Sequence, residues 1–180
     1  MHRIRLLENL DQYSISHVEE TQTVDLVKEF VLANTHCFER SLDIGHITGS
    51  AWIVNKDRTE VCLTHHRKLN IWVQPGGHAD GESNILSVAL KEAQEETGLK
   101  TLRVLSKDIF DIDVHRIPSR PENANHFHYD IRYYFEADSN ELPTVSDESH
   151  DVAWTPIDEI EHVTKEESVL RMCRKTKKVK

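Results

Sequence analysis

The stretch GGHADGESNILSVALKEAQEETGL, residues 76–99, joins a glycine pair to a helical pattern. It follows the extended run NIWVQP at residues 70–75, and the Gly76-Gly77 pair allows a tight turn with exposed backbone carbonyls. Residues 80–84 offer side chains that favour a helix N-terminus, and Gly98 is placed as a C-terminal stop. The stretch therefore predicts a strand, a glycine turn and a helix ending near Gly98.

Three carboxylates project from the helix face that should be buried. At about 100° per residue, the apolar positions 85, 88 and 89 share a face that extends through Glu92 and Glu96, with Glu95 on its flank. Like charges this close oppose ionisation unless a cation compensates them, and converging oxygens suit Mg²⁺ or Mn²⁺. A backbone carbonyl of the glycine turn could add a ligand. The alternative is a solvated acidic face, but the agreement between the turn and the helix favours a metal site.

These residues resemble the signature of the Nudix hydrolases, G-x5-E-x7-R-E-U-x-E-E-x-G-U with U aliphatic, over Gly77 to Leu99. Two positions depart from it: Ser83 stands where the pattern has its first Glu, with Glu82 one place early, and Lys91 stands where it has Arg. In the family these two residues mainly orient the loop and the helix. The departures therefore concern rate and geometry more than metal binding. The positions that match in register are Gly77, Glu92, Ala93, Glu95, Glu96, Gly98 and Leu99.

The resemblance implies an α/β Nudix fold, an α/β/α sandwich with a mixed curved sheet, and hydrolysis of a diphosphate joined to some moiety X. It implies Glu92 and Glu96 as principal metal ligands, Glu95 as ligand or base, and a turn carbonyl, of Gly76 before Gly77, in the shell. Glu148, in the loop before the strand at 152–154, is the alternative base or a turn glutamate in solvent. The expected organisation is an N-terminal helical extension at 1–44, a Nudix domain at 45–165 and a solvated basic tail at 166–180.

Composition limits the partners. The chain of 180 residues carries a formal charge of −9, which argues against general nucleic-acid affinity and leaves small anionic substrates open. Three dispersed cysteines fit a reducing cytoplasm, and no signal peptide or membrane span is expected. The helical pattern before residue 40 either packs on the domain or forms a homodimer surface.

Strand patterns occupy both sides of the helix. Residues 45–54 and 60–65 predict a hairpin, followed by the basic turn 65–68. Residues 109–115 and 126–135 alternate polar and apolar side chains, and antiparallel pairing across the loop at 117–121 would place their polar stripes on one face. That face is either an outer surface or a site. The candidates for substrate contact are Arg67, His78, His128 and Arg132.

Two other functions stay open. The departures at Ser83 and Lys91 suit a catalytically silent Nudix domain that binds a nucleotide-like metabolite as a sensor. His115, His126 and His128 would suit a transition-metal protein. If the chain is an enzyme, Lys91 predicts slower turnover than the full signature, because lysine lacks the two-pronged hold of arginine.

Overall fold

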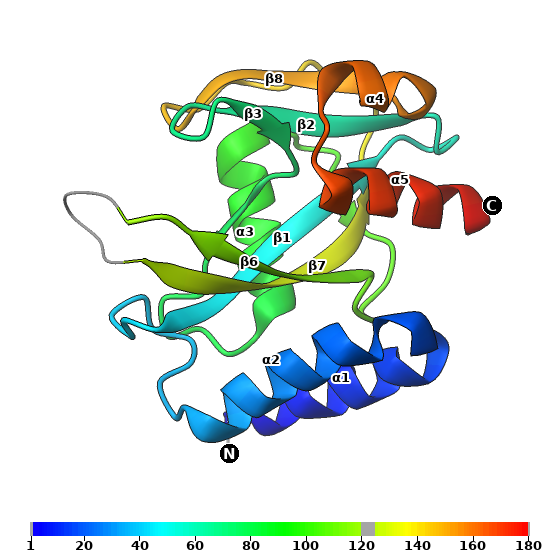
Figure 1. Cartoon of the computed structure of the whole chain (residues 1–180). Helices are drawn as coiled ribbons and strands as arrows, with labels where there is room; N and C mark the ends of the chain where they lie inside the picture. Colours follow the sequence, from blue (N-terminus) through cyan, green and yellow to red (C-terminus); the bar gives the residue numbers. More distant parts are fainter. Residues whose placement is uncertain (1, 120–124, 180) are drawn as a thin grey trace.

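The protein forms a mixed β-sheet covered by helices, as the computed structural model in Figure 1 shows. The structure describes residues 2–119 and 125–179, so Arg120 and Pro121 of the predicted loop lie outside the described residues. No helix in these ranges is long and apolar enough to cross a membrane. The helices are α1 Ile4–Ser16, α2 Thr21–Ala33, α3 Ile85–Thr97, α4 Ile160–Val163 and α5 Glu167–Lys178. The strands are β1 Gly45–Val54, β2 Glu60–His66, β3 Ile71–Val73, β4 Gly76–His78, β5 Arg103–Val104, β6 Asp111–Ile117, β7 His126–Glu136 and β8 Ser149–Pro156.

Within the described residues, the central strand β1 pairs with three other strands. It pairs with β2 and β4 in antiparallel fashion and with β7 in parallel, while β6 pairs with β7 and β8 with β2. The predicted hairpin of β1 and β2 and the predicted pairing of β6 with β7 are therefore confirmed. In the second pair, His115 lies opposite His128 and Asp113 opposite Asp130, so the polar stripes do face the same way.

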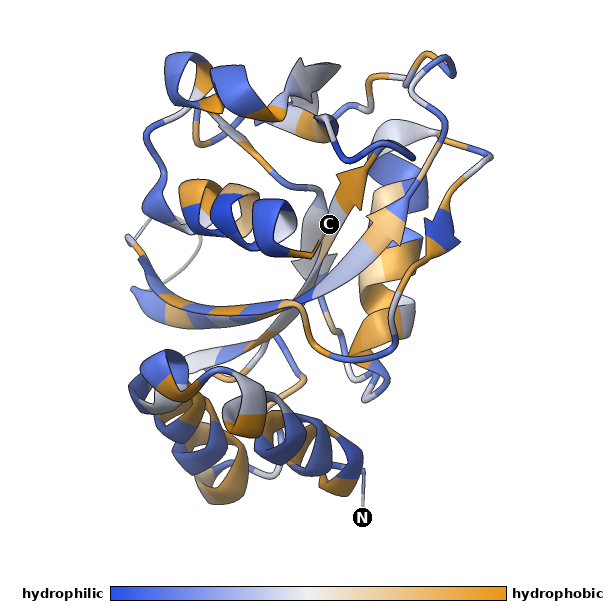
Figure 2. Cartoon of the chain, turned by 90° about the vertical axis from the view of Figure 1, so that its right-hand side faces the viewer, coloured by the Kyte–Doolittle hydropathy of each residue, from blue (hydrophilic) through white to orange (hydrophobic). Residues whose placement is uncertain are grey.

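Alternation along β1 divides the interior between the two faces of the sheet. Ile47, Ala51 and Ile53 belong to one hydrophobic cluster, which includes residues of α1, α2 and α3. Trp52 and Val54 point the other way and belong to a second cluster, with residues of α5. Figure 2 shows α3 on one side of the sheet and α5, which ends at the label C, on the other. The α/β fold with helices on both sides of a mixed sheet is thus as predicted.

The C-terminal segment differs from its prediction as a solvated tail. Helix α5 buries Val169, Met172, Cys173 and Thr176, which recur at helical spacing among the basic residues. Arg174, Lys177 and Lys178 are exposed, whereas Arg171 and Lys175 point inward to the buried Asp111. The high charge of the segment thus concealed a stripe of core-forming residues. At the other end of the chain, α1 and α2 confirm the predicted helical pattern, and their buried side chains join the first cluster.

Candidate functional site

The sequence predicts a tight turn at Gly76 and Gly77, but the structure places this glycine pair in the short strand β4, which pairs with β1. The glycine pair and helix α3 are held together by a hydrogen bond between backbone and carboxylate. The backbone N–H of Gly76 in β4 donates to Oε1 of Glu96 over 2.8 Å. Gly76 lies opposite Ser50 of β1, and a Cβ at position 76 would overlap the Ser50 side chain. Strand β4 can therefore approach β1 this closely only with glycine at this position, and the approach sets where Glu96 is held.

The Glu92 carboxylate packs closely against Gly77 of β4. A Cβ at position 77 would overlap the Glu92 carboxylate, whose side chain is only 18% exposed. One turn further along the same helix face, Glu96 is 7% exposed. The structure thus brings two of the three predicted carboxylates together against the glycine pair of β4.

Burial and like charge disfavour ionisation at this point. Burial raises the pKa of Glu96 to about 7; the hydrogen bond from Gly76 opposes this shift, and the negative charges of Glu92 and Glu148 reinforce it. Burial also raises the pKa of Glu92, although the ammonium of Lys91 opposes the shift. A positive charge bound here would relieve both effects.

Glu95 lies on the outer edge of this group. Its side chain is 58% exposed, and Nζ of Lys91 lies 3.0 Å from its Oε2 and 3.4 Å from Oε1 of Glu92. Lys91 thus pairs with the helix carboxylates of Glu95 and Glu92 through a single nitrogen. At the other departure from the signature, Glu82 uses its carboxylate to accept the backbone N–H of Asn84, so it orders the start of the helix rather than extending the group of carboxylates.

Glu148 and Arg67 meet on neighbouring segments. The backbone N–H of Arg67 donates to the carbonyl of Glu148 over 3.0 Å, and its guanidinium donates to the carbonyl of Ser149, also over 3.0 Å. Both residues are exposed, and the charge of Glu148 acts on Glu92 and Glu96. The loop before β8 therefore brings the charge of Glu148 near the two glutamates, and the turn after β2 holds Arg67 against that loop.

Arg132 has a different environment from the one expected of a substrate contact. It is 2% exposed, its Nε lies 2.7 Å from Asp130, and its Nη1 lies 3.0 Å from Asp111. Arg171 and Lys175 of α5 bind the same Asp111. Arg132 is thus an internal counter-ion that joins the sheet to α5, because the carboxylates on this face lie under that helix.

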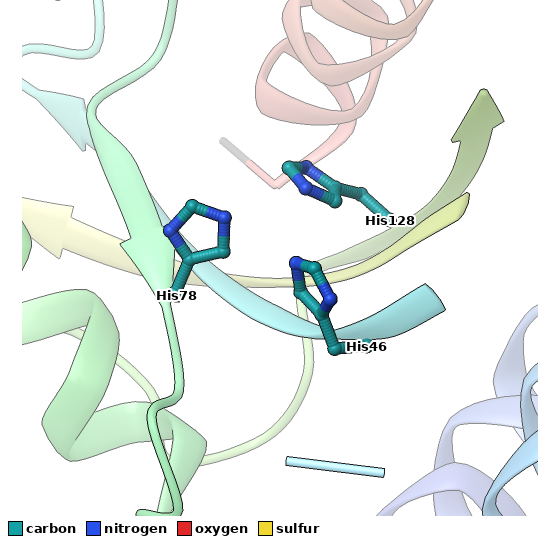
Figure 3. Close-up of side chains that lie close together, drawn as sticks. All are labelled: His46, His78 and His128. Atoms are coloured by element: carbon teal, nitrogen blue, oxygen red, sulfur yellow. The ribbon is translucent and has the colours of Figure 1, made fainter. Parts of the chain in front are cut away.

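Three histidines converge on the face of the sheet opposite α3, as Figure 3 shows. His46 in β1 lies next to His128 in β7 by strand register, and the two ring centroids are 4.8 Å apart. His78 in β4 places its ring 4.9 Å from that of His46 and 5.2 Å from that of His128. The structure therefore joins the predicted His78 and His128 to each other.

His46 was missed in the sequence, although a signal was present. His46, Thr48 and Ser50 alternate with apolar or small residues along β1, as the polar residues of β6 and β7 do. The expected histidine trio is only partly reproduced: His126 Nε2 lies 3.3 Å from His128 Nε2, and the His115 ring lies 5.5 Å from that of His128.

Burial keeps the three converging imidazoles uncharged. It lowers the pKa of His46 to about 4 and that of His128 to about 2, and the neighbouring histidines add to both shifts. Burial and the positive charge of Arg40 also lower the pKa of His78. All three rings are therefore neutral at pH 7 and have a lone pair available.

A profile of the NUDIX domain matches residues 46–173. The chain belongs to the Nudix hydrolase family. This family acts on pyrophosphate bonds. The matched region extends into α5, so the C-terminal helix belongs to the Nudix match as well as to the core.

Known Nudix proteins resemble the chain in sequence and in fold. A 70-residue segment is 37% identical to the m7GpppN-mRNA hydrolase NUDT17 of Xenopus laevis; it covers 36% of this chain and 22% of that protein. The chain therefore matches about a fifth of the relative's length. The fold resembles the C. elegans Ap4A hydrolase binary complex at TM-score 0.59, with 14% identity over 74% of this chain and 96% of that one.

Two further Nudix structures have the same fold. A Nudix-family hydrolase from Clostridium perfringens matches at TM-score 0.56, with 21% identity over 75% of this chain and 98% of that one. The NUDIX domain of Shewanella oneidensis NrtR, complexed with ADP ribose, matches at TM-score 0.51, with 15% identity over 73% of this chain and 86% of that one.

The Nudix carboxylates of this chain fit a hard divalent cation. The donors at the glycine pair are all oxygen atoms, Glu92 and Glu96 are enclosed against it, and burial raises the pKa of both carboxyl groups. Glu95 lies at the exposed edge of this group, where it pairs with Lys91.

Proposed function

We propose that the chain is a divalent-metal-dependent hydrolase that cleaves the diphosphate linkage of a nucleoside diphosphate joined to a moiety X, or of a related phosphorylated metabolite. The observation that carries this proposal is the Glu96 carboxylate, held by the Gly76 N–H beside Glu92. The Glu92 and Glu96 carboxylates are enclosed against the glycine pair of β4, so they are not part of a solvated acidic face. They make chemical sense as oxygen ligands.

The glutamates would hold Mg²⁺ or Mn²⁺. Glu92 and Glu96 are the principal ligands, with Glu95 as a third and the carbonyl of Gly76 as a backbone ligand. Such an ion, when bound, neutralises diphosphate charge and lowers the pKa of a water molecule. The chain itself supplies the geometry: the hydrogen bond from Gly76 orients Glu96, and the backbone of Gly77 fixes the position of Glu92.

The loop before β8 would supply a proton acceptor, and the turn after β2 would supply an anion contact. Glu148 is exposed and electrostatically coupled to Glu92 and Glu96, so it can take the proton of the attacking water; Glu95 is the alternative acceptor. Arg67, anchored by its two hydrogen bonds to this loop, would contact the anionic phosphate oxygens.

The substrate class follows from chemistry shared by the named relatives. Ap4A, ADP-ribose and the m7GpppN cap all contain phosphoric anhydride bonds attached to a nucleoside. A free small molecule is favoured over capped RNA, because the net charge of −9 disfavours a long polyanion. A homodimer through the N-terminal helices stays a prediction.

The test is a substrate panel assayed for products in H₂¹⁸O. ADP-ribose, Ap4A, a cap dinucleotide and nucleoside triphosphates are incubated with the full chain and Mg²⁺ or Mn²⁺. We expect cleavage of at least one compound, abolished by chelation, with ¹⁸O in one phosphate product. Absence of cleavage across the panel, with metal bound and the protein folded, would contradict hydrolysis of this substrate class.

A second candidate function is a silent Nudix domain that senses a metabolite. It is favoured by Ser83 and by the exposed Lys91, which makes single contacts where the signature has arginine. Calorimetry on the same panel separates the two functions. A sensor binds a compound with heat but releases no phosphate product, whereas an enzyme releases product from the compound it binds.

A further inference from the structure

We propose that His46, His78 and His128 form a binding site for one transition-metal ion of the Zn²⁺ class, separate from the carboxylate site. The three residues come from adjacent strands, β1, β4 and β7, whose pairing fixes the relative positions of their backbones. Sites built on paired strands are more rigid than sites built on loops. The proposed site does not depend on the hydrolase function.

The distances suit imidazole ligands around one ion. One potential ligand nitrogen from each histidine lies within 4.8 Å of the others, and the three rings point toward one another (Figure 3). Nitrogens bound to tetrahedral Zn²⁺ at about 2.0–2.1 Å are roughly 3.4 Å apart. Small ring rotations on fixed strands therefore suffice to reach a bound geometry.

His46 is the observation that requires an explanation. Its side chain is 3% exposed, and neither Nδ1 nor Nε2 has a hydrogen-bond partner among the described residues. A buried polar group normally has a partner, because leaving one unsatisfied costs free energy. An ion bound to one of these nitrogens supplies the missing interaction.

The charge state and the donor type select the class of ion. Imidazole suits Zn²⁺, Cu²⁺ and Ni²⁺, whereas Mg²⁺ and Ca²⁺ prefer oxygen ligands. A neutral imidazole has one ring nitrogen with a free lone pair, which is the donor that such an ion binds. His126 lies against His128 and would orient its ring, as groups behind metal-binding histidines commonly do.

Strand alternation separates this site from the glutamates. Gly77 and His78 are consecutive in β4, so their Cβ directions point to opposite faces of the sheet. Glu92 packs against Gly77, while His46 and His128 lie beside His78. His78 and His128 are thereby assigned to an ion rather than to direct contact with substrate.

The test uses the full chain, stripped of metal by a chelator and titrated with ZnCl₂ or CoCl₂ alone. We expect one equivalent of Zn²⁺ to bind and to raise the melting temperature, and Co²⁺ to give the intense visible absorption of a four- or five-coordinate site. His78→Asn and His128→Asn each remove one proposed ligand. Each should weaken Zn²⁺ binding by more than about 100-fold, the upper range for changes behind the ligands.

Two controls make the outcome decisive. His162→Asn removes an exposed histidine on α4 and should bind Zn²⁺ as the wild type does. Glu96→Gln should also keep the Zn²⁺ equivalent, because its carboxylate belongs to the other site. Zn²⁺ binding that survives both histidine substitutions, or that disappears with Glu96→Gln alone, would overturn the proposal. Circular dichroism confirms folding, and two ligand variants are made so that one misfolded protein does not decide the result.

Discussion

The backbone N–H of Gly76 donates to Oε1 of Glu96 over 2.8 Å, across 20 residues of sequence. This hydrogen bond connects strand β4 to the last turn of α3. It explains why a buried carboxylate is retained on a helix face that otherwise packs into the core. Strand β4 and helix α3 therefore form one structural unit, in which the glycine pair and Glu96 position each other.

Gly77→Ala is expected to displace Glu92 without unfolding the protein. The new methyl group would overlap the end of a flexible side chain, which can move away at little cost to stability. A displacement of about 1 Å in a metal ligand can lower kcat/KM by about 100-fold. Steady-state kinetics and a melting curve check this, with Ser87→Ala on the exposed face of α3 as control. Unchanged kcat/KM in Gly77→Ala would show that catalysis does not depend on the close packing of Glu92 against Gly77.

Lys91→Arg is expected to raise turnover. Lys91 contacts Glu95 and Glu92 through one nitrogen, whereas a guanidinium can bind a carboxylate through two. We expect a gain in kcat/KM on the order of tenfold, equivalent to about 1.4 kcal/mol. Stability should hardly change, because an exposed ion pair contributes little. Lys100→Arg is the matched control. If Lys91→Arg leaves both metal affinity and turnover unaltered, Lys91 has no orienting role.

Asp111→Asn is expected to destabilise the protein in a pH-dependent manner. Burial alone would raise the pKa of Asp111, but the hydrogen bond from Arg171 and the charges of Arg132 and Lys175 outweigh it and hold the pKa below its ordinary value. A lowered pKa contributes stability that is present above the unfolded-state pKa of about 3.9 and is lost as the pH falls below it.

The variant should therefore lose about 3–5 kcal/mol at pH 7, because Arg132 stays buried with one counter-ion fewer. The difference from wild type should narrow as the pH falls below 4. Urea unfolding across this range measures it, with the exposed Asp43→Asn as control. A difference that stays constant with pH would rule out the electrostatic explanation.

Met172→Ala is expected to cost about 2–5 kcal/mol, as for other large-to-small changes in a core. Met172 is fully buried between α5 and the sheet. Arg174→Ala on the exposed face of the same helix should change stability by less than about 0.5 kcal/mol. Both variants introduce alanine, so helix propensity is matched. Equal effects in urea unfolding would restore the interpretation of this segment as a dispensable tail.

Local periodicity made much of the fold predictable. The helix ending at Gly98, which has a φ of +66°, follows from its spacing and stop signal. The hairpin of β1 and β2 follows from two runs of β-forming residues around a polar turn. The facing stripes of β6 and β7 follow from period-two alternation, which the observed register of Asp111 with Arg132 confirms.

Long-range pairing could not be predicted in the same way. The parallel contact of β1 with β7 brings His46 beside His128 across 82 residues of chain, and no local pattern encodes that register. The burial of Arg132 had the same origin, because it depends on α5 folding back over the polar face. Net charge concealed α5 itself, since its basic residues outnumber the apolar ones that pack.

The most direct test of the central claim measures Mn²⁺ affinity and product release in the same samples of wild type, Glu96→Gln and Glu29→Gln. Glu29 is exposed on α2 and serves as the matched control. We expect Glu96→Gln to lose about 100-fold or more in both quantities while Glu29→Gln matches the wild type. If a folded Glu96→Gln protein keeps the wild-type Mn²⁺ affinity and turnover, the catalytic metal site is not formed by the glycine pair of β4 and the glutamates of α3.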